Sequence, residues 1–336
     1  MHEARQYTKL ENNIVKCSLC NHRCRIQPGK HGICGVRWNE NGILHAATYG
    51  KISAEAIDPI EKKPLFHYLP GTLSYSLGSI GCNFHCEHCQ NWHISRAASE
   101  EAGSSLRSLP PEEGVARAID NRCASISWTY NEPAIWHEYP LDMGTIGRAE
   151  GLGTVYVTNG YITEEALREL SPMLQAYRVD IKAFGDEFYK KICGARLQPV
   201  LDSTIVAKEL GMHIETVTLV IPGHNDSPEE LGRLIRWVVE NLGPDTPMHF
   251  SAFHPDYRMT DRGATPIGTL EKIYELAKRL GLRYPYLGNV RSSRYENTYC
   301  PSCGTTLIER QGFATRILML DGMQCRKCGE KIAIVR

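Results

Sequence analysis

The sequence has no excess of charge of either sign and no long apolar run. Its 336 residues include 38 basic and 38 acidic side chains, so the formal net charge is zero. A balanced chain gives no electrostatic reason to expect nucleic acid or an anionic membrane as a partner. No apolar run approaches the ~20 residues of a membrane-spanning helix, and the polar first residues lack the apolar core of a signal peptide. We therefore expect a cytoplasmic protein with neither nucleic acid nor a membrane as a partner.

Cysteine is plentiful instead, and its spacing indicates metal sites. All but two of the 13 cysteines fall into three clusters. Pairs of the form C-x2-C in a cytoplasmic protein indicate metal ligands rather than disulfides. Cys123 and Cys193 stand alone, as buried apolar thiols commonly do. The three clusters are Cys17, Cys20, Cys24 and Cys34; Cys82, Cys86 and Cys89; and Cys300, Cys303, Cys325 and Cys328.

The middle of the chain alternates between strand-like and helix-like segments. A helix start is marked by Ser227 as the capping residue, Pro228 at the first helical position and Glu230 to complete a capping box. Strands that alternate with helices predict parallel β/α units, and six of them would form a partial (β/α)6 barrel of the TIM type. The strand candidates are residues 74–80, 123–129, 154–158, 176–182, 213–221 and 248–253.

Polar or ionisable residues follow each of these predicted strands. The first strand leads into the middle cysteine cluster, the second into "TYNEP" and the third into "TNG". In β/α barrels the carboxyl ends of the strands carry the active site. Six such loops in order therefore predict a single site at that face.

The loop after the first predicted strand carries three cysteines, spaced C-x3-C-x2-C. A [4Fe–4S] cluster normally takes four cysteine ligands, so Cys82, Cys86 and Cys89 would leave one iron open to another ligand. A structural zinc site fills its ligand shell instead. The alternative is a zinc knuckle that borrows His85 or His88.

The cysteine loop and the motifs around it resemble the radical S-adenosylmethionine (SAM) superfamily. "CNFHCEHCQN" is similar in particular to the activating enzymes of glycyl-radical enzymes, such as pyruvate formate-lyase activase. "CSLCNHRC", "TYNEPAIW", "VTNGY" and "YPYLGNV" are similar to the radical SAM member of the AmmeMemoRadiSam group. The resemblance covers nearly the whole chain. The cysteine motif is highly specific, and the other motifs are specific in combination.

The resemblance implies an oxidoreductase that works through a radical. Cys82, Cys86 and Cys89 would bind three irons of a [4Fe–4S] cluster, and the amino and carboxylate groups of SAM would chelate the fourth iron. A one-electron donor such as flavodoxin or ferredoxin would reduce the cluster. Reductive cleavage of SAM would then give a 5′-deoxyadenosyl radical that removes hydrogen from a substrate.

The resemblance also implies residues that bind SAM. Many members carry Gly-Gly-Glu after the second strand, where this chain has Tyr130, Asn131 and Glu132. Glu132 matches the residue that holds the SAM amino group. The two glycines are replaced, and Asn131 could supply a side-chain carbonyl in their place. Asn159 belongs to a matching Thr-Asn-Gly turn, which ordinary turn chemistry also explains.

Asp180 and Lys182 match an Asp-x-Lys pattern of the activases. One residue separates them, so both side chains leave the same face of a strand. The resemblance implies that Lys182 neutralises the SAM carboxylate and that Asp180 accepts from the ribose hydroxyls. The alternative is an ordinary salt bridge at a strand end. His254 matches a polar residue near the ribose, and His88 replaces an aromatic residue near the adenine.

The carboxyl-terminal cysteines form two C-x2-C-G knuckles. The glycine after each pair allows the turn that points amides at thiolates, and the spacing between the pairs is close to that of zinc sites. Residues 293–336 are therefore predicted to form a zinc ribbon, with an iron site of the rubredoxin type as the alternative. Because cysteine fills all four positions, a structural or docking role is expected.

The amino-terminal cysteines leave the identity of their metal open. Their spacing, C-x2-C-x3-C-x9-C, fits neither of two common ferredoxin patterns. Zinc, with His22 or His31 entering its shell, and an auxiliary iron–sulfur cluster both suit it. The chain thus divides into a cysteine-rich metal-binding segment at 1–65, a radical SAM partial barrel at 66–292 and the ribbon at 293–336.

Two classes of function fit these motifs. A radical SAM enzyme needs Glu132, Asp180 and Lys182, whereas a metal-bearing adaptor with a degenerate barrel has no reason to retain them. We therefore expect the enzyme. Its expected substrate is a protein, attacked at a glycine as by the activases, and a small molecule is the alternative.

Overall fold

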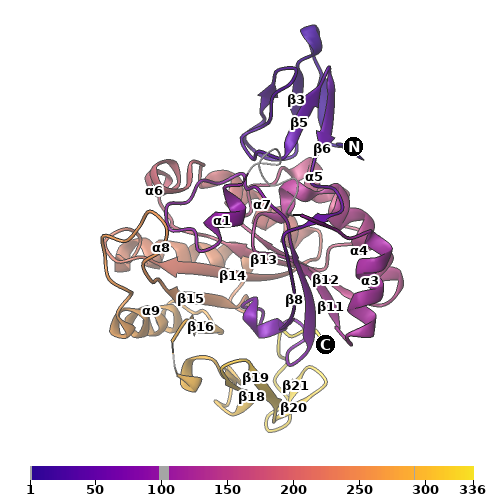
Figure 1. Cartoon of the computed structure of the whole chain (residues 1–336). Helices are drawn as coiled ribbons and strands as arrows, with labels where there is room; N and C mark the ends of the chain where they lie inside the picture. Colours follow the sequence, from indigo (N-terminus) through magenta and orange to yellow (C-terminus); the bar gives the residue numbers. More distant parts are fainter. Residues whose placement is uncertain (1, 98–105, 291) are drawn as a thin grey trace.

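A mixed β-sheet occupies the centre of the computed structural model, which describes residues 2–97, 106–290 and 292–336 (Figure 1). Within these residues the sheet has eight strands in the order β16-β15-β14-β13-β12-β11-β9-β8. Neighbouring strands pair in parallel except at one edge, where β8 runs antiparallel to β9. The strands are β8 Ala54–Pro59, β9 Leu73–Gly78, β11 Ser125–Trp128, β12 Gly153–Thr158, β13 Ala176–Asp180, β14 His213–Val220, β15 Met248–Ala252 and β16 Pro285–Gly288.

The six strands predicted from the sequence are all present, as β9 and β11 to β15. The structure adds β16 as a seventh parallel strand and β8 as an antiparallel edge strand. β16 has only four residues and begins with proline, and β8 contains two acidic residues and ends with proline. Neither has the apolar run that marks the other six. The prediction of six parallel strands was therefore too low by one.

Helices connect the strands and pack beside them. α3 and α4 lie next to β11, and α9 lies next to β15 and β16 (Figure 1). In the described part of the chain, no helix combines the length and apolarity that crossing a membrane requires. The α-helices are α1 Trp92–Ser95, α3 Pro111–Asp120, α4 Glu138–Ala149, α5 Glu164–Leu170, α6 Asp186–Phe188, α7 Gln198–Glu209, α8 Pro228–Trp237 and α9 Ile267–Arg279.

Helix α8 begins where the sequence predicts. The Ser227 hydroxyl accepts a hydrogen bond from Glu230 N at 3.2 Å. The Glu230 carboxylate does not complete a capping box, because it accepts from Phe184 N at 2.7 Å instead. That bond ties α8 to the loop after β13, one of the loops that surround the site.

The amino-terminal segment forms two small sheets at one end of the molecule (Figure 1). A buried ion pair fixes it to the rest: Arg37 Nη1 and Nη2 each lie 2.7 Å from a carboxylate oxygen of Glu138 in α4. Both side chains are at most 2% exposed, and breaking such a buried pair costs about 3–5 kcal/mol. The strands are β1 His2–Glu3, β2 Tyr7–Lys9, β3 Val15–Cys17, β4 Arg25–Ile26, β5 Arg37–Glu40 and β6 Ile43–Ala46.

The carboxyl-terminal segment lies at the opposite end (Figure 1). Arg310 anchors it, since its buried guanidinium donates to Phe66 O at 2.7 Å and to Thr298 Oγ1 at 2.8 Å. A ring nitrogen of His67 bonds Ala333 O at 2.7 Å. The strands of this segment are β17 Thr298–Tyr299, β18 Thr306–Gln311, β19 Ala314–Ile317, β20 Leu320–Asp321 and β21 Gln324–Cys325.

Candidate active site at the carboxyl ends of the strands

The loop between β9 and α1 presents three thiols, those of Cys82, Cys86 and Cys89. Two main-chain hydrogen bonds tie this loop to the π-helix Tyr189–Cys193. His85 N donates to Cys193 O at 2.8 Å, and Glu87 N donates to Ile192 O at 3.1 Å. Because the main chain fixes the loop, the thiols remain available as ligands.

Gly81 and Asn131 fix the start of the cysteine loop. Gly81 has a φ of 80°, and a Cβ there would lie 2.5 Å from the carbonyl oxygen of Cys34, so only glycine fits. Asn131 Oδ1 accepts from Ser79 N at 3.0 Å, and its Nδ2 donates to Gly81 O at 3.1 Å. The Asn131 amide, a candidate SAM contact in the sequence, thus bonds the main chain that leads into the cysteine loop.

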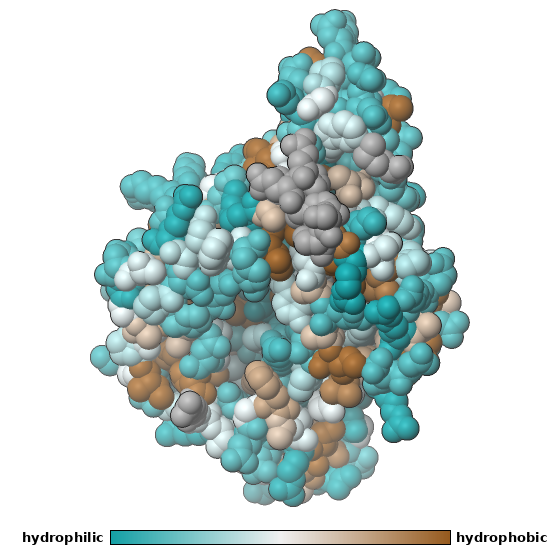
Figure 2. Space-filling model, in the orientation of Figure 1, coloured by the Kyte–Doolittle hydropathy of each residue, from teal (hydrophilic) through white to brown (hydrophobic). Residues whose placement is uncertain are grey.

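The three thiols line a cavity of about 540 Å³. Pockets of this size hold small organic ligands and cofactors. The face of the molecule in Figure 2 is hollowed between the amino-terminal segment and the carboxyl-terminal segment. Apart from His254, every residue predicted to bind the cluster or SAM lines this cavity: Cys82, Cys86, Cys89, His88, Asn131, Glu132, Asn159, Asp180 and Lys182.

Glu132 joins the loops that follow β11 and β12. The residue is 2% exposed, and its carboxylate accepts from Ala134 N at 2.9 Å, Thr158 Oγ1 at 2.6 Å and Asn159 N at 2.7 Å. Burial raises the pKa of Glu132 to about 7, against the effect of these three donors. A carboxylate has about four acceptor positions, so capacity remains for the amino group of a ligand.

Asn159 connects the Glu132 carboxylate to the cysteine loop. Its Nδ2 donates to Asn83 Oδ1 at 2.8 Å, and its Oδ1 accepts from Tyr161 N at 3.0 Å. Gly160 follows with a φ of 74°, the positive value that the predicted Asn-Gly turn requires. The turn after β12 therefore holds the residue next to Cys82.

Arg178, Asp180 and Lys182 alternate along β13 and its end, so their side chains share one face. The Asp180 carboxylate pairs with Arg178 on one side and with Lys182 Nζ, 3.1 Å away, on the other. Burial works against these charges, but the two cations outweigh it and lower the pKa of Asp180, which in turn raises the pKa of Lys182. The cavity wall thus carries a row of charges of alternating sign.

The two histidines predicted near SAM lie in different places. His88 lines the cavity, and burial lowers its pKa to about 3, so the imidazole is neutral. Its Nδ1 is buried and has no hydrogen-bond partner among the described residues, which suits a polar ligand. His254 is exposed and approaches the cavity through Gln90, whose Nε2 lies 2.8 Å from His254 Nε2.

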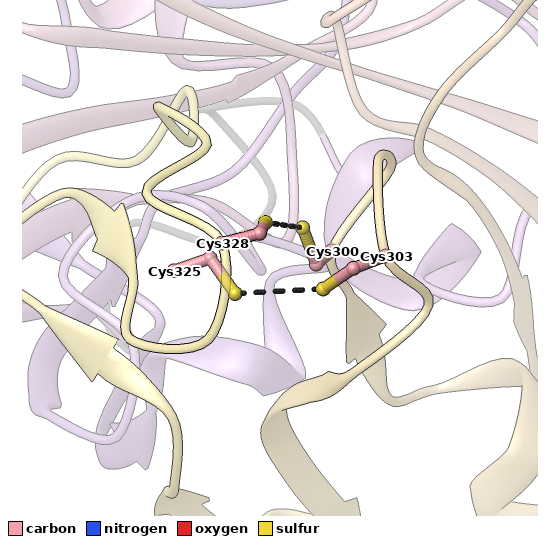
Figure 3. Close-up of side chains that lie close together, drawn as sticks. All are labelled: Cys300, Cys303, Cys325 and Cys328. Atoms are coloured by element: carbon pink, nitrogen blue, oxygen red, sulfur yellow. Dashed lines mark hydrogen bonds between the residues drawn. The ribbon is translucent and has the colours of Figure 1, made fainter.

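The four carboxyl-terminal cysteines form a separate cluster (Figure 3). The sulfurs of Cys300 and Cys328 are 3.5 Å apart, those of Cys303 and Cys325 are 3.7 Å apart, and all four lie within 4.8 Å of one another. Tetrahedral zinc with Zn–S bonds of about 2.3 Å places its thiolates about 3.8 Å apart. Across the described residues, no other group of three or more Cys, His, Asp or Glu side chains is close enough to share one ion.

Comparison with known proteins identifies the family. Residues 77–237 match the model of the radical SAM superfamily. The chain belongs to the radical SAM superfamily. The uncharacterized protein MJ0808 of Methanocaldococcus jannaschii is 48% identical to it over the full length of both chains.

Solved structures of radical SAM proteins are similar to this chain in part. A domain of pyruvate-formate lyase-activating enzyme from Bacteroides vulgatus is 13% identical, with a TM-score of 0.43, over 49% of this chain and 99% of that one. A radical SAM methyltransferase from Sphaerobacter thermophilus is 16% identical, with a TM-score of 0.49, over 65% of this chain and 66% of that one.

Radical SAM membership implies a [4Fe–4S] cluster and SAM, and the residues present fit both. In the described structure the three loop thiols line one cavity, and they do not belong to a group of ligand atoms close enough to share one ion. A cluster, whose irons and sulfides separate the thiolates, does not require that closeness. The alternative of a zinc knuckle with His85 or His88 has no matching group of close ligand atoms among the described residues. The unpartnered nitrogen of His88 and the cation of Lys182 suit the polar groups of SAM.

Sequence reasoning missed several residues of the radical SAM cavity. Arg178 could have been found, because it precedes Asp180 by two residues on the same strand face. Lys63 and Phe313 reach the cavity from distant parts of the chain, and no local pattern marks them. Tyr130, seen only as a departure from Gly-Gly-Glu, has a φ of 73°, a conformation that glycine adopts without strain.

Replacing Lys182 by Ala tests its contact with SAM. We expect SAM binding to weaken by about 1.5–3 kcal/mol, because a charged hydrogen bond to the SAM carboxylate is lost. Iron content should not change, since Lys182 is no cluster ligand. Titration with SAM under anaerobic conditions and iron analysis measure the two quantities. Lys190→Ala, which removes an exposed lysine paired with Asp186, is the matched control. An unchanged SAM affinity in Lys182→Ala would remove Lys182 from the SAM site.

Proposed function

We propose that this protein is a radical SAM enzyme that holds its substrate in the cavity beside the cysteine loop. The superfamily implies SAM cleavage with an iron–sulfur cluster. The observation that supports the site is the convergence of the three loop thiols with Glu132, Asp180 and Lys182 on one cavity. An adaptor protein would have no use for SAM-binding groups around a thiol-lined cavity.

The residues around the cavity have different roles in binding SAM. When bound, the reduced cluster and SAM supply a 5′-deoxyadenosyl radical, which removes hydrogen from an unreactive C–H bond. Lys182 neutralises the SAM carboxylate, Glu132 accepts from the SAM amino group, and Asp180 accepts from the ribose hydroxyls. The neutral ring of His88 packs near the adenine. The enclosing walls exclude water from the radical, and flavodoxin or ferredoxin provides the electron.

The proposed substrate is a polypeptide, with a glycine Cα–H as the reacting position. The cysteine loop and the Asp-x-Lys strand resemble those of activases that act on a polypeptide backbone. The carboxyl-terminal segment supports this choice, because Gly312 and Phe313, between β18 and β19, also line the cavity. Phe313 is 53% exposed. An exposed aromatic side chain at the cavity rim offers apolar contact to an incoming loop.

An anionic small molecule is the second candidate, and Arg178 favours it. Arg178 lines the cavity, and its side chain is 9% exposed. In the described structure its Nε is buried without a hydrogen-bond partner. An unsatisfied buried donor is unfavourable, and a carboxylate or phosphate group would satisfy it through a charged hydrogen bond.

Reductive cleavage of SAM tests the enzyme assignment. Iron and sulfide are restored to the protein under anaerobic conditions, a reductant and SAM are added, and 5′-deoxyadenosine is measured. We expect the wild type to form it, and replacement of Cys82, Cys86 and Cys89 by Ala to abolish it because the cluster loses its ligands. Cys123→Ala, at an isolated buried thiol, is the control. Formation at the wild-type rate by the triple variant excludes the assignment, and no formation by the wild type favours the adaptor.

Deuterium transfer distinguishes the two substrate classes. Candidate partner proteins and extracted metabolites are supplied in deuterated form under the same reducing conditions. We expect deuterium to reach 5′-deoxyadenosine from the protein fraction, together with a glycyl-type radical signal, because that fraction holds the reacting C–H bond. Deuterium arriving from the metabolite fraction alone would reject the polypeptide substrate and support the anionic small molecule.

We also propose that Cys300, Cys303, Cys325 and Cys328 bind zinc and make the carboxyl-terminal segment a zinc ribbon. Their sulfur–sulfur distances of 3.5 and 3.7 Å support a single tetrahedral ion. The metal has a structural role here, since four thiolates leave no open position. By holding the two knuckles together it also holds the hairpin that carries Phe313 to the cavity rim.

Metal analysis of the purified protein tests the ribbon. We expect zinc that is lost when Cys300 and Cys303 are replaced by Ser, because two of the four ligands are removed. Cleavage of SAM should be largely retained in that variant. Ser302→Ala, in the same knuckle, should keep its zinc and controls for local disturbance. A preparation of full stability that contains no zinc would contradict the proposal.

A further inference from the structure

Four cysteines of the amino-terminal segment line a second pocket. Cys17 ends β3, Cys20 and Cys24 lie in the turn between β3 and β4, and Cys34 lies before β5. Sequence spacing alone left their metal open between zinc and an iron–sulfur cluster. The arrangement of the thiols in the structure bears on that choice.

The spacing of these thiols differs from that of a single-ion site. Cys300, Cys303, Cys325 and Cys328 show what such a site is like in this chain, with all four sulfurs within 4.8 Å. Within the described residues the amino-terminal cysteines provide no group of three ligand atoms close enough to share one ion. In this they match Cys82, Cys86 and Cys89 in the loop between β9 and α1, which we call the SAM-cluster loop. A cluster, whose irons and sulfides lie between the thiolates, does not require three thiolates within reach of one ion.

The four cysteines of this pocket supply four ligands without any histidine. His22, a candidate zinc ligand in the sequence, also lines the pocket, and its Nε2 lies 2.7 Å from Asn83 O. His31 is not among the residues that line the pocket and stacks on Trp38 at 6.3 Å. The four cysteines are therefore the ligand set, and apolar side chains such as Leu19, Ile26 and Ile135 enclose them.

The second pocket adjoins the SAM-cluster loop directly. A Cβ on Gly81, the residue before Cys82, would lie 2.5 Å from the carbonyl oxygen of Cys34. Asn83, the residue after Cys82, lines the second pocket and is bonded by His22 through its carbonyl. The main chain on both sides of Cys82 therefore contacts the amino-terminal site.

We propose that Cys17, Cys20, Cys24 and Cys34 bind an iron–sulfur cluster through which electrons reach the cluster held by Cys82, Cys86 and Cys89. A reduced flavodoxin or ferredoxin gives up one electron to the amino-terminal cluster, which returns to its oxidised form by passing that electron on, and no bond is made or broken. The assignment of the metal is independent of the proposed function, whereas the electron path rests on it. The position fits the path, since the segment projects from the molecule next to the SAM-cluster loop (Figure 1).

The decisive protein is the full chain in which Cys82, Cys86 and Cys89 are all replaced by Ala. After anaerobic reconstitution, iron, sulfide and zinc are measured, and the absorption and electron paramagnetic resonance spectra are recorded. We expect iron and sulfide with cluster spectra, because the amino-terminal ligands are intact. Adding Cys17→Ser and Cys20→Ser should remove that iron, whereas adding Cys300→Ser and Cys303→Ser should remove only zinc.

The triple-Ala protein also tests the electron path without any SAM chemistry. Reduced flavodoxin is added, and the paramagnetic signal of the reduced amino-terminal cluster is followed. We expect the signal to appear. Zinc in place of iron in the triple-Ala protein overturns the metal assignment, whether or not the Ser variants fold. If dithionite reduces this iron but flavodoxin and ferredoxin do not, the proposed electron path is wrong. A wild type that cleaves no SAM would instead defeat the proposed function and leave the metal assignment standing.

Discussion

The carboxylate of Glu132 is the interaction on which the site depends. It accepts hydrogen bonds from Ala134 N, Thr158 Oγ1 and Asn159 N, so one buried group joins the loops after β11 and β12. Asn159 in turn donates a hydrogen bond from its side chain to Asn83, the residue after Cys82. A parallel sheet only brings its loops to a common edge. Hydrogen bonds to a buried carboxylate, which are strong where the dielectric is low, then hold those loops in one arrangement.

Charge is kept inside the cavity by pairing it along a strand. Arg178, Asp180 and Lys182 lie on one face of β13, and each cation lies beside the anion. An unpaired charge in this partly buried position would lose part of its hydration without compensation. The pairing therefore keeps two cations charged in the cavity wall, Lys182 near the SAM-cluster loop and Arg178 further along the strand. Each of them can contact an anionic group of a ligand in place of Asp180. The cavity wall therefore carries fixed charges before a ligand binds, and these charges favour ligands with complementary groups.

The cysteine clusters of the chain differ in how close their sulfurs lie. The ribbon brings four sulfurs within 4.8 Å of one another between two tight knuckles (Figure 3). Among the described residues, neither the cysteine loop after β9 nor the amino-terminal pocket has three ligand atoms that close together. Thiolates repel one another and tolerate close approach only around a cation. The main chain at Gly81, next to Cys82, packs directly against the main chain at Cys34, so the two sites are in contact.

The sequence by itself determined the features that short-range patterns encode. The cysteine spacing, the six apolar strands, the Ser227 cap and the shared face of Asp180 and Lys182 follow from periodicity and local hydrogen bonding, and the cysteine motif identified the superfamily. Tertiary structure alone decided the edge strands β8 and β16, the pairing of Arg37 with Glu138, and the arrival of Phe313 at the cavity. It also decided that Asn131 bonds the main chain before the cysteine loop and that His254 stays exposed. Such contacts join residues far apart in the chain, and their energies depend on packing that no local pattern records.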